Sequence, residues 1–414
     1  MDEIIEKIKT NRVVQIFIGI IIIIILIIGG FLYLNKILSK SFRENLPCYN
    51  QTITIWSPFN FNDFQEFSKH ARKYCINLNL KQKDLNDIKN NLLQEIAQGN
   101  IPDIVFVDSD FLLENLKIFK GYEGKNFNID VYSESILEPF DNKLIAYPLY
   151  FDVLVTFANR EYLNNAGLLT APKTFEELQQ VIPSLRTLDN SNNIKVAPIA
   201  LGTANNIDRL YEIFVTIHKN LNQDYYKYPE SFYKTLDFYT QFSNKLSHNF
   251  SWENYLPNSF VAFAQGQAAL IFGLYSDKDK ILNINKRIKL EIYPFMRFTN
   301  NIKNYNYIKS YFFAVPKQGK HKYAWMVLEF FDKYYENFIN KKNLLPVKKI
   351  LIGQVDKQKK EIVKDLLIGD YFKEFNRPYF ENAIKIDIQN WLSDKESIKR
   401  IMKTEQINKF FNKK

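Results

Sequence analysis

Residues Leu144 to Leu185 read LIAYPLYFDVLVTFANREYLNNAGLLTAPKTFEELQQVIPSL. The apolar first half predicts a long strand that passes from one lobe of the protein into another. The second half contains a helix start, because Thr174 can cap the helix and Glu177 follows three residues later, as in a capping box. Apolar residues then recur at helical spacing from Phe175 onward. We therefore expect a strand that links two lobes and a helix soon after it.

The residues before this stretch alternate between strand and helix patterns. Short β-rich runs at Ile53 to Pro58 and Ile76 to Leu80 are separated by one helical pattern, and a second helical pattern ends at Gly99. The continuous apolar run Ile104 to Val107 is typical of a strand that is buried on both faces. This βαβαβ order predicts a parallel sheet with helices on its faces.

The length and composition fit a globular protein of two lobes. The chain has 414 residues, and single hydrophobic cores stop growing at about 250–300 residues. The aromatic share of 15% accompanies a chain rich in Ile, Asn and Lys, so that share alone does not indicate sugar stacking. The formal net charge is +10, but the basic residues are interleaved with acidic ones and form no long block. This pattern argues against nucleic-acid binding.

The sequence contains no catalytic signature and no metal-ligand spacing. We find no phosphate-binding loop, nucleophile elbow, dinucleotide motif or zinc-protease motif, and the four histidines are scattered. We therefore expect a binding protein without a metal or cofactor, and not an enzyme. The two cysteines, Cys48 and Cys75, could form one disulfide if the main domain lies outside the membrane, or both could remain free thiols.

An uncharged apolar run extends from Val13 to Leu34 and is long enough to cross a hydrocarbon core of about 30 Å as a helix. A buried core helix is the first alternative, but apolar side chains all around the helix favour lipid. A cleaved signal peptide is the second alternative. It stays open because Gly29 and Gly30 are small residues, as are those at a cleavage site. The run is longer than a signal h-region, so an uncleaved signal-anchor helix is favoured.

This interpretation divides the N-terminal part into a short cytoplasmic tail (residues 1–12), the transmembrane helix (13–34) and a polar linker (35–49). Three basic residues lie on each side of the helix, so the positive-inside rule does not decide its orientation. The first cysteine comes well after the apolar run, which does not support lipidation. The expected location is the cell membrane, with the C-terminal domain extracytoplasmic.

Several segments carry a resemblance to a known family. The chain is similar to extracellular solute-binding protein family 1, which includes the maltose-binding and other sugar-binding proteins of ABC importers. The similar segments occur in the family's order and lie between about Ile53 and Lys349. They are QGNIPDIVFVDSD, AYPLYFDVLVTFANREYL, NAGLLTAPKTFEEL, VAPIALG, FAQGQAALIFGLY, YFFAVPK and NLLPVKK. These motifs are structural, so they identify the fold better than the ligand.

The resemblance implies an α/β, two-lobed periplasmic-binding-protein-like fold (type II), here with an N-terminal transmembrane helix. Residues 50–155 and 306–345 would form lobe 1, and residues 156–305 and 346–414 would form lobe 2. The lobes of such a fold close on a hinge around a ligand. The implied partners are a small-molecule solute and the permease subunits of an ABC importer.

Candidate ligand-binding residues follow from strand ends and from this resemblance. Ligands of open α/β sheets bind beyond the carboxyl ends of strands, which selects Phe59, Asn60 and Asp108. Asp108 could equally be a helix cap. Tyr150 and Asp152 match positions near which the family commonly contacts ligand, as the resemblance implies.

The remaining candidates belong to lobe 2 and to the return strand. The segment GTANNIDR follows the VAPIAL strand, and its polar side chains could face the ligand or only cap the next helix. The resemblance points to Tyr275, although the family's usual tryptophan after VAPIALG is missing, which weakens a sugar assignment. The full set is Asn205, Asn206, Arg209, Tyr275, Tyr307 and Ser310.

Three functions compete at this point. The first is the solute-binding component of an ABC importer, with a small ligand that is a sugar or another solute. The second is a membrane-anchored sensor or surface-binding protein that uses the same two lobes. The third is an enzyme acting on glycans, which the lack of a recognisable carboxylate pair disfavours. Loss of solute uptake on gene deletion would distinguish the importer from the sensor.

Overall fold

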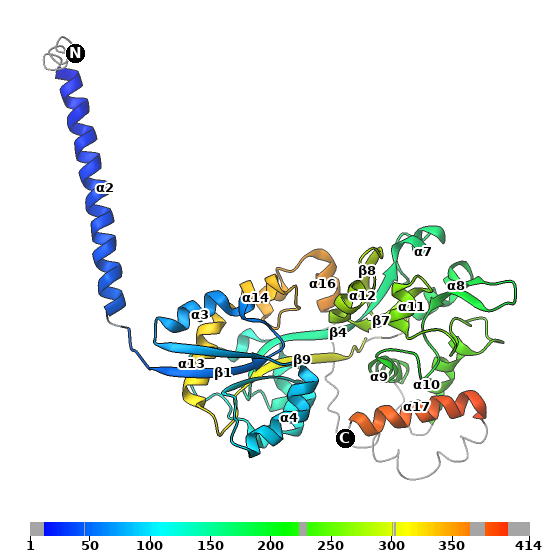
Figure 1. The fold of residues 1–414 in the computed structure, drawn as a ribbon. Coiled ribbons are helices and arrows are strands. Elements are labelled where there is room, and N and C mark those ends of the chain that lie inside the picture. Colours follow the sequence, from blue (N-terminus) through cyan, green and yellow to red (C-terminus); the bar gives the residue numbers. More distant parts are fainter. Residues whose placement is uncertain are drawn as a thin grey trace.

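The computed structural model describes residues 12–44, 46–222, 230–299, 301, 304–364 and 377–395. Most of the expected cytoplasmic tail, residues 1–11, lies outside the described residues. Two lobes lie side by side and are joined by long strands, and the helix α2 (Arg12–Glu44) extends away from them (Figure 1). The mixed α/β architecture with two lobes is the one that the sequence predicts.

Helix α2 carries the apolar run of the N-terminal part. Its large apolar side chains between Ile20 and Leu34 are 48% to 69% exposed. Among the residues that the structure describes, no helix is both long enough and apolar enough to cross a bilayer. The expected transmembrane helix therefore stays a prediction.

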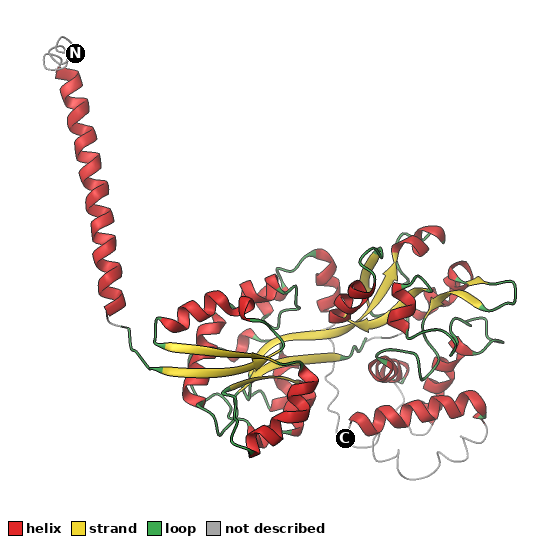
Figure 2. Cartoon of the chain, viewed as in Figure 1, coloured by secondary structure: helices red, strands yellow, loops and turns green. Residues whose placement is uncertain are grey.

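Lobe 1 is built on a sheet whose first three strands follow the predicted order. Strand β1 pairs in parallel with both β2 and β3, and β9 adds to β3 in the antiparallel direction. Helices cover both faces of this sheet (Figure 2). The strands are β1 (Gln51–Ser57), β2 (Ile76–Gln82), β3 (Ile104–Asp108) and β9 (Ile308–Ala314), and the longer helices are α3 (Gln65–Arg72), α4 (Leu85–Ala97), α5 (Ser109–Glu114), α13 (His321–Asp332) and α14 (Tyr335–Lys341).

Shorter turns of helix connect these elements. They are η1 (Phe61–Phe64), η2 (Leu116–Ile118), η3 (Ile129–Val131), α6 (Glu134–Leu137) and η4 (Glu138–Phe140). Helix α4 ends before Gly99, whose φ of +82° is the left-handed conformation that a residue just past a helix commonly adopts. The helical pattern that the sequence placed before Gly99 is therefore confirmed.

A disulfide joins Cys48 to Cys75, the pairing that the sequence left open. Their Cα atoms lie 4.9 Å apart, and the two residues are separated by 27 positions in the chain. The bond ties the chain just before β1 to the residue just before β2. Closing a loop of this length restricts the unfolded chain and stabilises the fold by roughly 3 kcal/mol.

Strand β4 (Tyr147–Asn159) links the two lobes, and all of its 13 residues are buried. Its first half pairs with β9 of lobe 1, and its second half pairs with β7 and β8 of lobe 2, in each case antiparallel. One continuous path of strands therefore runs through the molecule in the order β2-β1-β3-β9-β4-β7-β6-β5. The long crossing strand that the sequence predicts is confirmed.

Lobe 2 contains the remaining strands and most of the later helices. The strands are β5 (Thr187–Leu188), β6 (Ile194–Ile199), β7 (Ala268–Leu274) and β8 (Leu290–Pro294). The helices are α7 (Arg160–Asn165), α8 (Phe175–Leu185), α9 (Leu210–Leu221), α10 (Glu230–Thr240), η5 (Gln241–Ser243), α11 (Ser259–Ala264), η6 (Tyr275–Asp277), α12 (Lys278–Ile284), α16 (Lys357–Val363) and α17 (Arg377–Ser393). Helix α17 packs against α10 and α9.

The predicted helix start after β4 forms with one change. Thr174 caps α8, and its Oγ1 accepts a hydrogen bond from the Glu177 N–H at 3.1 Å. The Glu177 carboxylate accepts a hydrogen bond from the Lys173 N–H at 2.7 Å, one residue earlier than in a capping box. The helix start is confirmed, and the reciprocal bond is displaced by one residue.

The chain passes from lobe 1 back to lobe 2 a second time after α14. There the Phe151 N–H of β4 donates to the carbonyl of Leu345 at 3.2 Å, so the returning chain lies directly beside the crossing strand. Helices α15 (Lys349–Ile352) and α16 follow, and α16 packs against β8. The residue limits that the sequence gives to the two lobes stay a prediction.

Candidate ligand-binding site

Strands β4 and β9 form an antiparallel pair where the lobes meet, and one face of this pair carries aromatic and charged side chains. Tyr150 pairs with Tyr311, and Asp152 pairs with Lys309. These four side chains share one face, because successive side chains of a strand point to opposite faces. Ser310 lies between Lys309 and Tyr311, so its side chain belongs to the other face.

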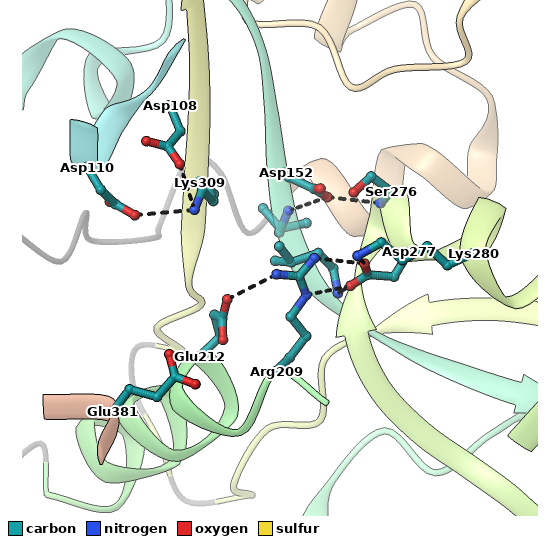
Figure 3. Close-up of polar contacts among 12 residues, drawn as sticks. Asp108, Asp110, Asp152, Arg209, Glu212, Ser276, Asp277, Lys280, Lys309 and Glu381 are labelled. Atoms are coloured by element: carbon teal, nitrogen blue, oxygen red, sulfur yellow. Dashed lines mark hydrogen bonds and ion pairs between the residues drawn. The ribbon is translucent and has the colours of Figure 1, made fainter. Parts of the chain in front are cut away.

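In lobe 1, Lys309 binds two carboxylates at the end of β3. Its Nζ lies 3.0 Å from Asp108 Oδ2 and 3.3 Å from Asp110 Oδ2 (Figure 3). Lys89 Nζ lies 3.0 Å from the same Asp108 oxygen, and Asp108 Oδ1 accepts a hydrogen bond from the Phe111 N–H at the start of α5. Burial raises the pKa of Asp108, but the two lysines and this N–H outweigh burial and lower the pKa to about 2. Asp108 is thus both a helix cap and a buried charged group.

In lobe 2, Arg209 lies directly before α9, and its guanidinium group connects the start of this helix to η6. Its Nε and Nη2 each donate to one oxygen of Asp277 at 2.8 Å, and its Nη1 lies 3.5 Å from Glu212 Oε1. Lys280 adds a contact of 2.9 Å to Asp277. Burial raises the pKa of Asp277, but Arg209 and Lys280 outweigh burial and hold the pKa below its ordinary value. The paired geometry therefore keeps a buried carboxylate charged.

Asp152 lies between these two groups of ion pairs and differs from both. Its side chain is buried, and its Oδ1 accepts hydrogen bonds from the Ser276 N–H at 3.2 Å and the Val153 N–H at 3.1 Å. Its Oδ2 has no hydrogen-bond partner among the described residues. Burial raises the pKa of Asp152 to about 6, and the charge of Asp277 acts in the same direction, while hydrogen bonds from Ser276 and the charge of Arg209 lower the pKa by less. Asp152 is a buried carboxylate with one unsatisfied oxygen.

Aromatic rings extend the same face into lobe 1. The rings of Tyr150 and Tyr311 are stacked, with centroids 4.5 Å apart, and the ring of Phe106 stacks on Tyr311 at 5.5 Å. Phe59, after β1, contacts Phe106 and Tyr150 edge-on. The tyrosines and charged groups around β4 define what we call the junction cluster: Asp108, Asp110, Tyr150, Asp152, Arg209, Glu212, Asp277, Lys309 and Tyr311.

Three predicted residues lie outside the junction cluster. Asn60 is exposed in lobe 1, where its N–H donates to Asp63. Asn205 is exposed in lobe 2, where its Oδ1 accepts a hydrogen bond from Gln389 of α17 at 2.8 Å. Asn206 is buried and uses both amide hydrogens and its oxygen inside lobe 2, on two carbonyls and on the Trp252 indole. The amide of Asn206 holds the loop together and is not available to a ligand.

Three further predicted residues lie near the cluster with different surroundings. Tyr275 begins η6, and the Nζ of Lys278 lies 3.7 Å from the centre of its ring. Tyr307 is buried just before β9. Ser310 is buried on the opposite face of β9, and its hydroxyl has no hydrogen-bond partner among the described residues.

The sequence missed Lys309, Glu212 and Asp277. Lys309 is adjacent to the predicted Ser310, and the alternation of side chains along a strand could have shown that only one of these two residues shares a face with Tyr311. Glu212 follows the predicted Arg209 by three residues, a spacing at which side chains at a helix start can meet. Asp277 had no comparable signal, because it is 68 residues away from Arg209 in the chain. In the described residues no group of three or more histidine, cysteine and acidic side chains could hold a metal ion.

Replacing Asp152 with asparagine is expected to stabilise the empty protein by about 2 kcal/mol near pH 7.5. The pKa of Asp152 rises from 3.8 to about 6 on folding, so the native state binds the proton more tightly. Ionised Asp152 therefore costs free energy at pH values above about 6, and this cost disappears as the pH falls from about 6 to below 3.8. The rise in pKa corresponds to about 3 kcal/mol of unfolding free energy, which the variant regains. The buried amide of the new asparagine has no partner and costs about 1 kcal/mol, which leaves a gain of about 2 kcal/mol.

Urea unfolding at two pH values checks this prediction, with Asp130→Asn as the matched control because Asp130 is exposed in lobe 1. The gain should vanish near pH 4, because the protonated form then dominates in the native state and the remaining cost of ionised Asp152 no longer exceeds the cost of the amide. A variant that is less stable than the parent chain near pH 7.5 would show that the Asp152 carboxylate is compensated in the native state.

Two lobes joined by a buried crossing strand, with polar and aromatic side chains gathered between them, define a two-lobed binding protein of the periplasmic-binding type. The chain belongs to the bacterial extracellular solute-binding protein family, whose model matches residues 54–337. This membership indicates an extracytoplasmic role for the two-lobed part. Proteins of this family bind solutes and are typically not enzymes.

Solved structures share the fold at low sequence identity. An ABC substrate-binding protein from Listeria monocytogenes in complex with cycloalternan is 15% identical, with a TM-score of 0.67 over 88% of this chain and 100% of that chain. An ABC transporter solute-binding protein from Thermotoga lettingae bound with alpha-D-tagatose is 18% identical, with a TM-score of 0.62 over 85% of this chain and 97% of that chain. The sugar-binding protein MalE from Xanthomonas citri is 14% identical, with a TM-score of 0.63 over 85% and 94%. No curated protein sequence matches the chain significantly.

Proposed function

We propose that this protein captures a carbohydrate between its two lobes outside the cytoplasm and delivers it to an ABC importer. The observation that carries the proposal is the junction cluster, to which both lobes contribute side chains around one buried strand. Carbohydrate recognition needs flat aromatic faces for the apolar side of the sugar ring and carboxylates or amides for the hydroxyls. Tyr150 and Tyr311 supply the first kind of group, and Asp152 supplies the second.

The comparisons support a carbohydrate as the solute. The structures from Listeria monocytogenes and Thermotoga lettingae were solved with cycloalternan and alpha-D-tagatose, and the Xanthomonas citri protein is described as sugar-binding. Those ligands belong to those proteins, and the low identity carries only the fold over to this chain. Within the proposal, the candidate contacts in this chain are Phe59, Tyr150, Asp152, Arg209 and Tyr275.

Membrane attachment through residues 13–34 is part of the same proposal. The apolar side chains of α2 described between Ile20 and Leu34 are exposed on all sides of the helix, and a bilayer would cover them. Extraction of membranes with carbonate and with detergent tests this part. The full chain should remain in the carbonate pellet and dissolve in detergent, and release by carbonate alone would contradict an anchoring helix.

A carbohydrate that binds this protein is expected to raise its melting temperature. A ligand at about 100 times its Kd stabilises the native state by about 2.7 kcal/mol, which raises the melting temperature of a chain of this size by roughly 2–3 °C. Thermal unfolding of the full chain in detergent, with a panel of sugars, amino acids, peptides and polyamines, measures this shift. A shift only with a solute other than a carbohydrate would contradict the carbohydrate assignment.

Uptake separates the importer from a sensor that uses the same fold. Cells that lack the gene should take up the radiolabelled ligand found in the melting screen more slowly than the parent cells. Restoring the gene should restore uptake. Unchanged uptake together with altered gene expression would favour the membrane-anchored sensor.

A further inference from the structure

Asp152 is the one member of the junction cluster whose carboxylate shows an oxygen without a partner in the described part of the chain. Its side chain is only 1% exposed, so bulk water does not compensate the missing partner. The two hydrogen bonds to its other oxygen come from backbone N–H groups and bring no positive charge. An unpaired carboxylate in a buried position costs free energy, and a donor from outside the chain would remove that cost.

The cations around Asp152 are held by other groups. Lys309, its direct neighbour across the β4–β9 pair, contacts Asp108 and Asp110. Arg209 uses two nitrogens on Asp277 and directs a third toward Glu212 (Figure 3). The third cation, Lys278, donates its ammonium to the carbonyl of Asn343 at 3.0 Å. Arg209 lowers the pKa of Asp152, but burial outweighs this effect, and no cation of the described residues lies within ion-pair distance of the Asp152 carboxylate.

The other carboxylates of the junction cluster differ from Asp152 in their ion-pair partners. The cluster contains five carboxylates, at Asp108, Asp110, Asp152, Glu212 and Asp277, and two cations, at Arg209 and Lys309. Lys89 and Lys280 reach two of the carboxylates from the outer side and are themselves 29% and 62% exposed. Every carboxylate of the cluster except Asp152 therefore has a cation within ion-pair distance.

We propose that the solute of this site is a carbohydrate that carries a protonated amine, and that its ammonium group binds Asp152 Oδ2. This inference rests on the proposed function. An ammonium donates a hydrogen bond and also supplies the missing charge, and charge-assisted hydrogen bonds are about twice as strong as neutral ones. The hydroxyl of a neutral sugar supplies only the hydrogen bond.

Matched sugars test the proposal by titration calorimetry on the full chain in detergent micelles. The probes are glucosamine, galactosamine and the β-1,4-linked glucosamine dimer, each compared with its N-acetyl form and with the sugar in which a hydroxyl replaces the amine. We expect the amine form of at least one set to bind about ten-fold more tightly than both neutral partners. This comparison uses the unaltered chain, so it does not depend on the folding of any variant.

A variant then assigns the preference to one residue. Asp152→Asn should bind the amine and hydroxyl forms with similar affinity, whereas the control Asp130→Asn should keep the preference of the parent chain. An equal or higher affinity for the neutral forms in the parent chain would overturn the inference and leave carbohydrate binding intact. A preference that survives in Asp152→Asn would also overturn it. Binding of none of the sugars by any chain would instead refute the proposed function.

Discussion

Replacing Lys309 with methionine is expected to lower the free energy of unfolding by about 4 kcal/mol near pH 7.5. Lys309 contacts Asp108, whose side chain is fully buried, and Asp110, whose side chain is 9% exposed. Methionine fills a similar volume but leaves both carboxylates with less positive charge. Breaking a buried ion pair by removing one partner is costly, because the other partner stays buried and charged. Urea unfolding followed by circular dichroism measures the loss.

The matched control for Lys309→Met is Lys89→Met. Lys89 contacts the same oxygen of Asp108, but its side chain is 29% exposed, and its removal leaves Lys309 in place. We expect a loss of about 1 kcal/mol for this control. Equal losses in the two variants would contradict the view that Lys309 is the main partner of the buried carboxylates.

The pH dependence of the Lys309 effect has a defined sign. The pKa of Asp108 is about 2 in the native state, below its ordinary value of 3.8, so the native state favours the charged form. The stability that this provides is present above the ordinary pKa and is lost as the pH falls toward about 2. The difference between the parent chain and Lys309→Met should therefore shrink as the pH falls below about 4.

Replacing Arg209 with methionine is expected to cost about 3 kcal/mol of unfolding free energy. The change removes two hydrogen bonds of 2.8 Å from Asp277 and leaves Lys280 as the remaining cation, on a side chain that is 62% exposed. Glu212, whose side chain is 2% exposed, also loses a contact. Because Arg209 joins the start of α9 to η6 beside Asp152, affinity for a solute should fall as well.

A double variant and a surface control make the Arg209 prediction specific. Arg209→Met combined with Asp277→Asn should recover part of the loss, because the second change removes the carboxylate that the first leaves without its guanidinium. Arg160→Met should cost about 1 kcal/mol, since Arg160 and Glu291 form a partly exposed pair at 3.5 Å and Arg160 also donates to the carbonyl of Leu169. No recovery in the double variant would contradict a direct coupling between Arg209 and Asp277.

Local patterns in the sequence predicted the features of the fold that depend on local physics. The run from Tyr147 to Asn159 is rich in aromatic and β-branched residues, which favour a strand, and β4 is that strand, buried along its whole length. Thr174 and Gly99 mark helix ends because their chemistry suits those positions. The order of strand and helix patterns gave the parallel pairing of β1, β2 and β3.

The candidate site could be predicted only in part, because its contacts join residues that are far apart in the chain. Asp108 and Lys309 are separated by about 200 residues, so no local pattern shows that they meet. The sequence pointed to Ser310 and not to its neighbour Lys309, and the two side chains lie on opposite faces because one position along a strand changes the face. Asn206 shows that residue type and position do not decide a role. Its type and its place after a strand suggest a ligand contact, but its amide donates two hydrogen bonds to carbonyl groups within lobe 2.

The most direct test of the central claim is a calorimetric titration of the full chain with the carbohydrate that gives the largest rise in melting temperature. We expect saturable binding of one ligand per chain, about ten-fold weaker in Tyr150→Ala, which loses a ring at the lobe junction. Tyr255→Ala should bind like the parent chain, because Tyr255 is 56% exposed and hydrogen-bonds to Ile194 in lobe 2. Absence of saturable binding, or equal affinity in a folded Tyr150→Ala, would contradict a carbohydrate site between the lobes.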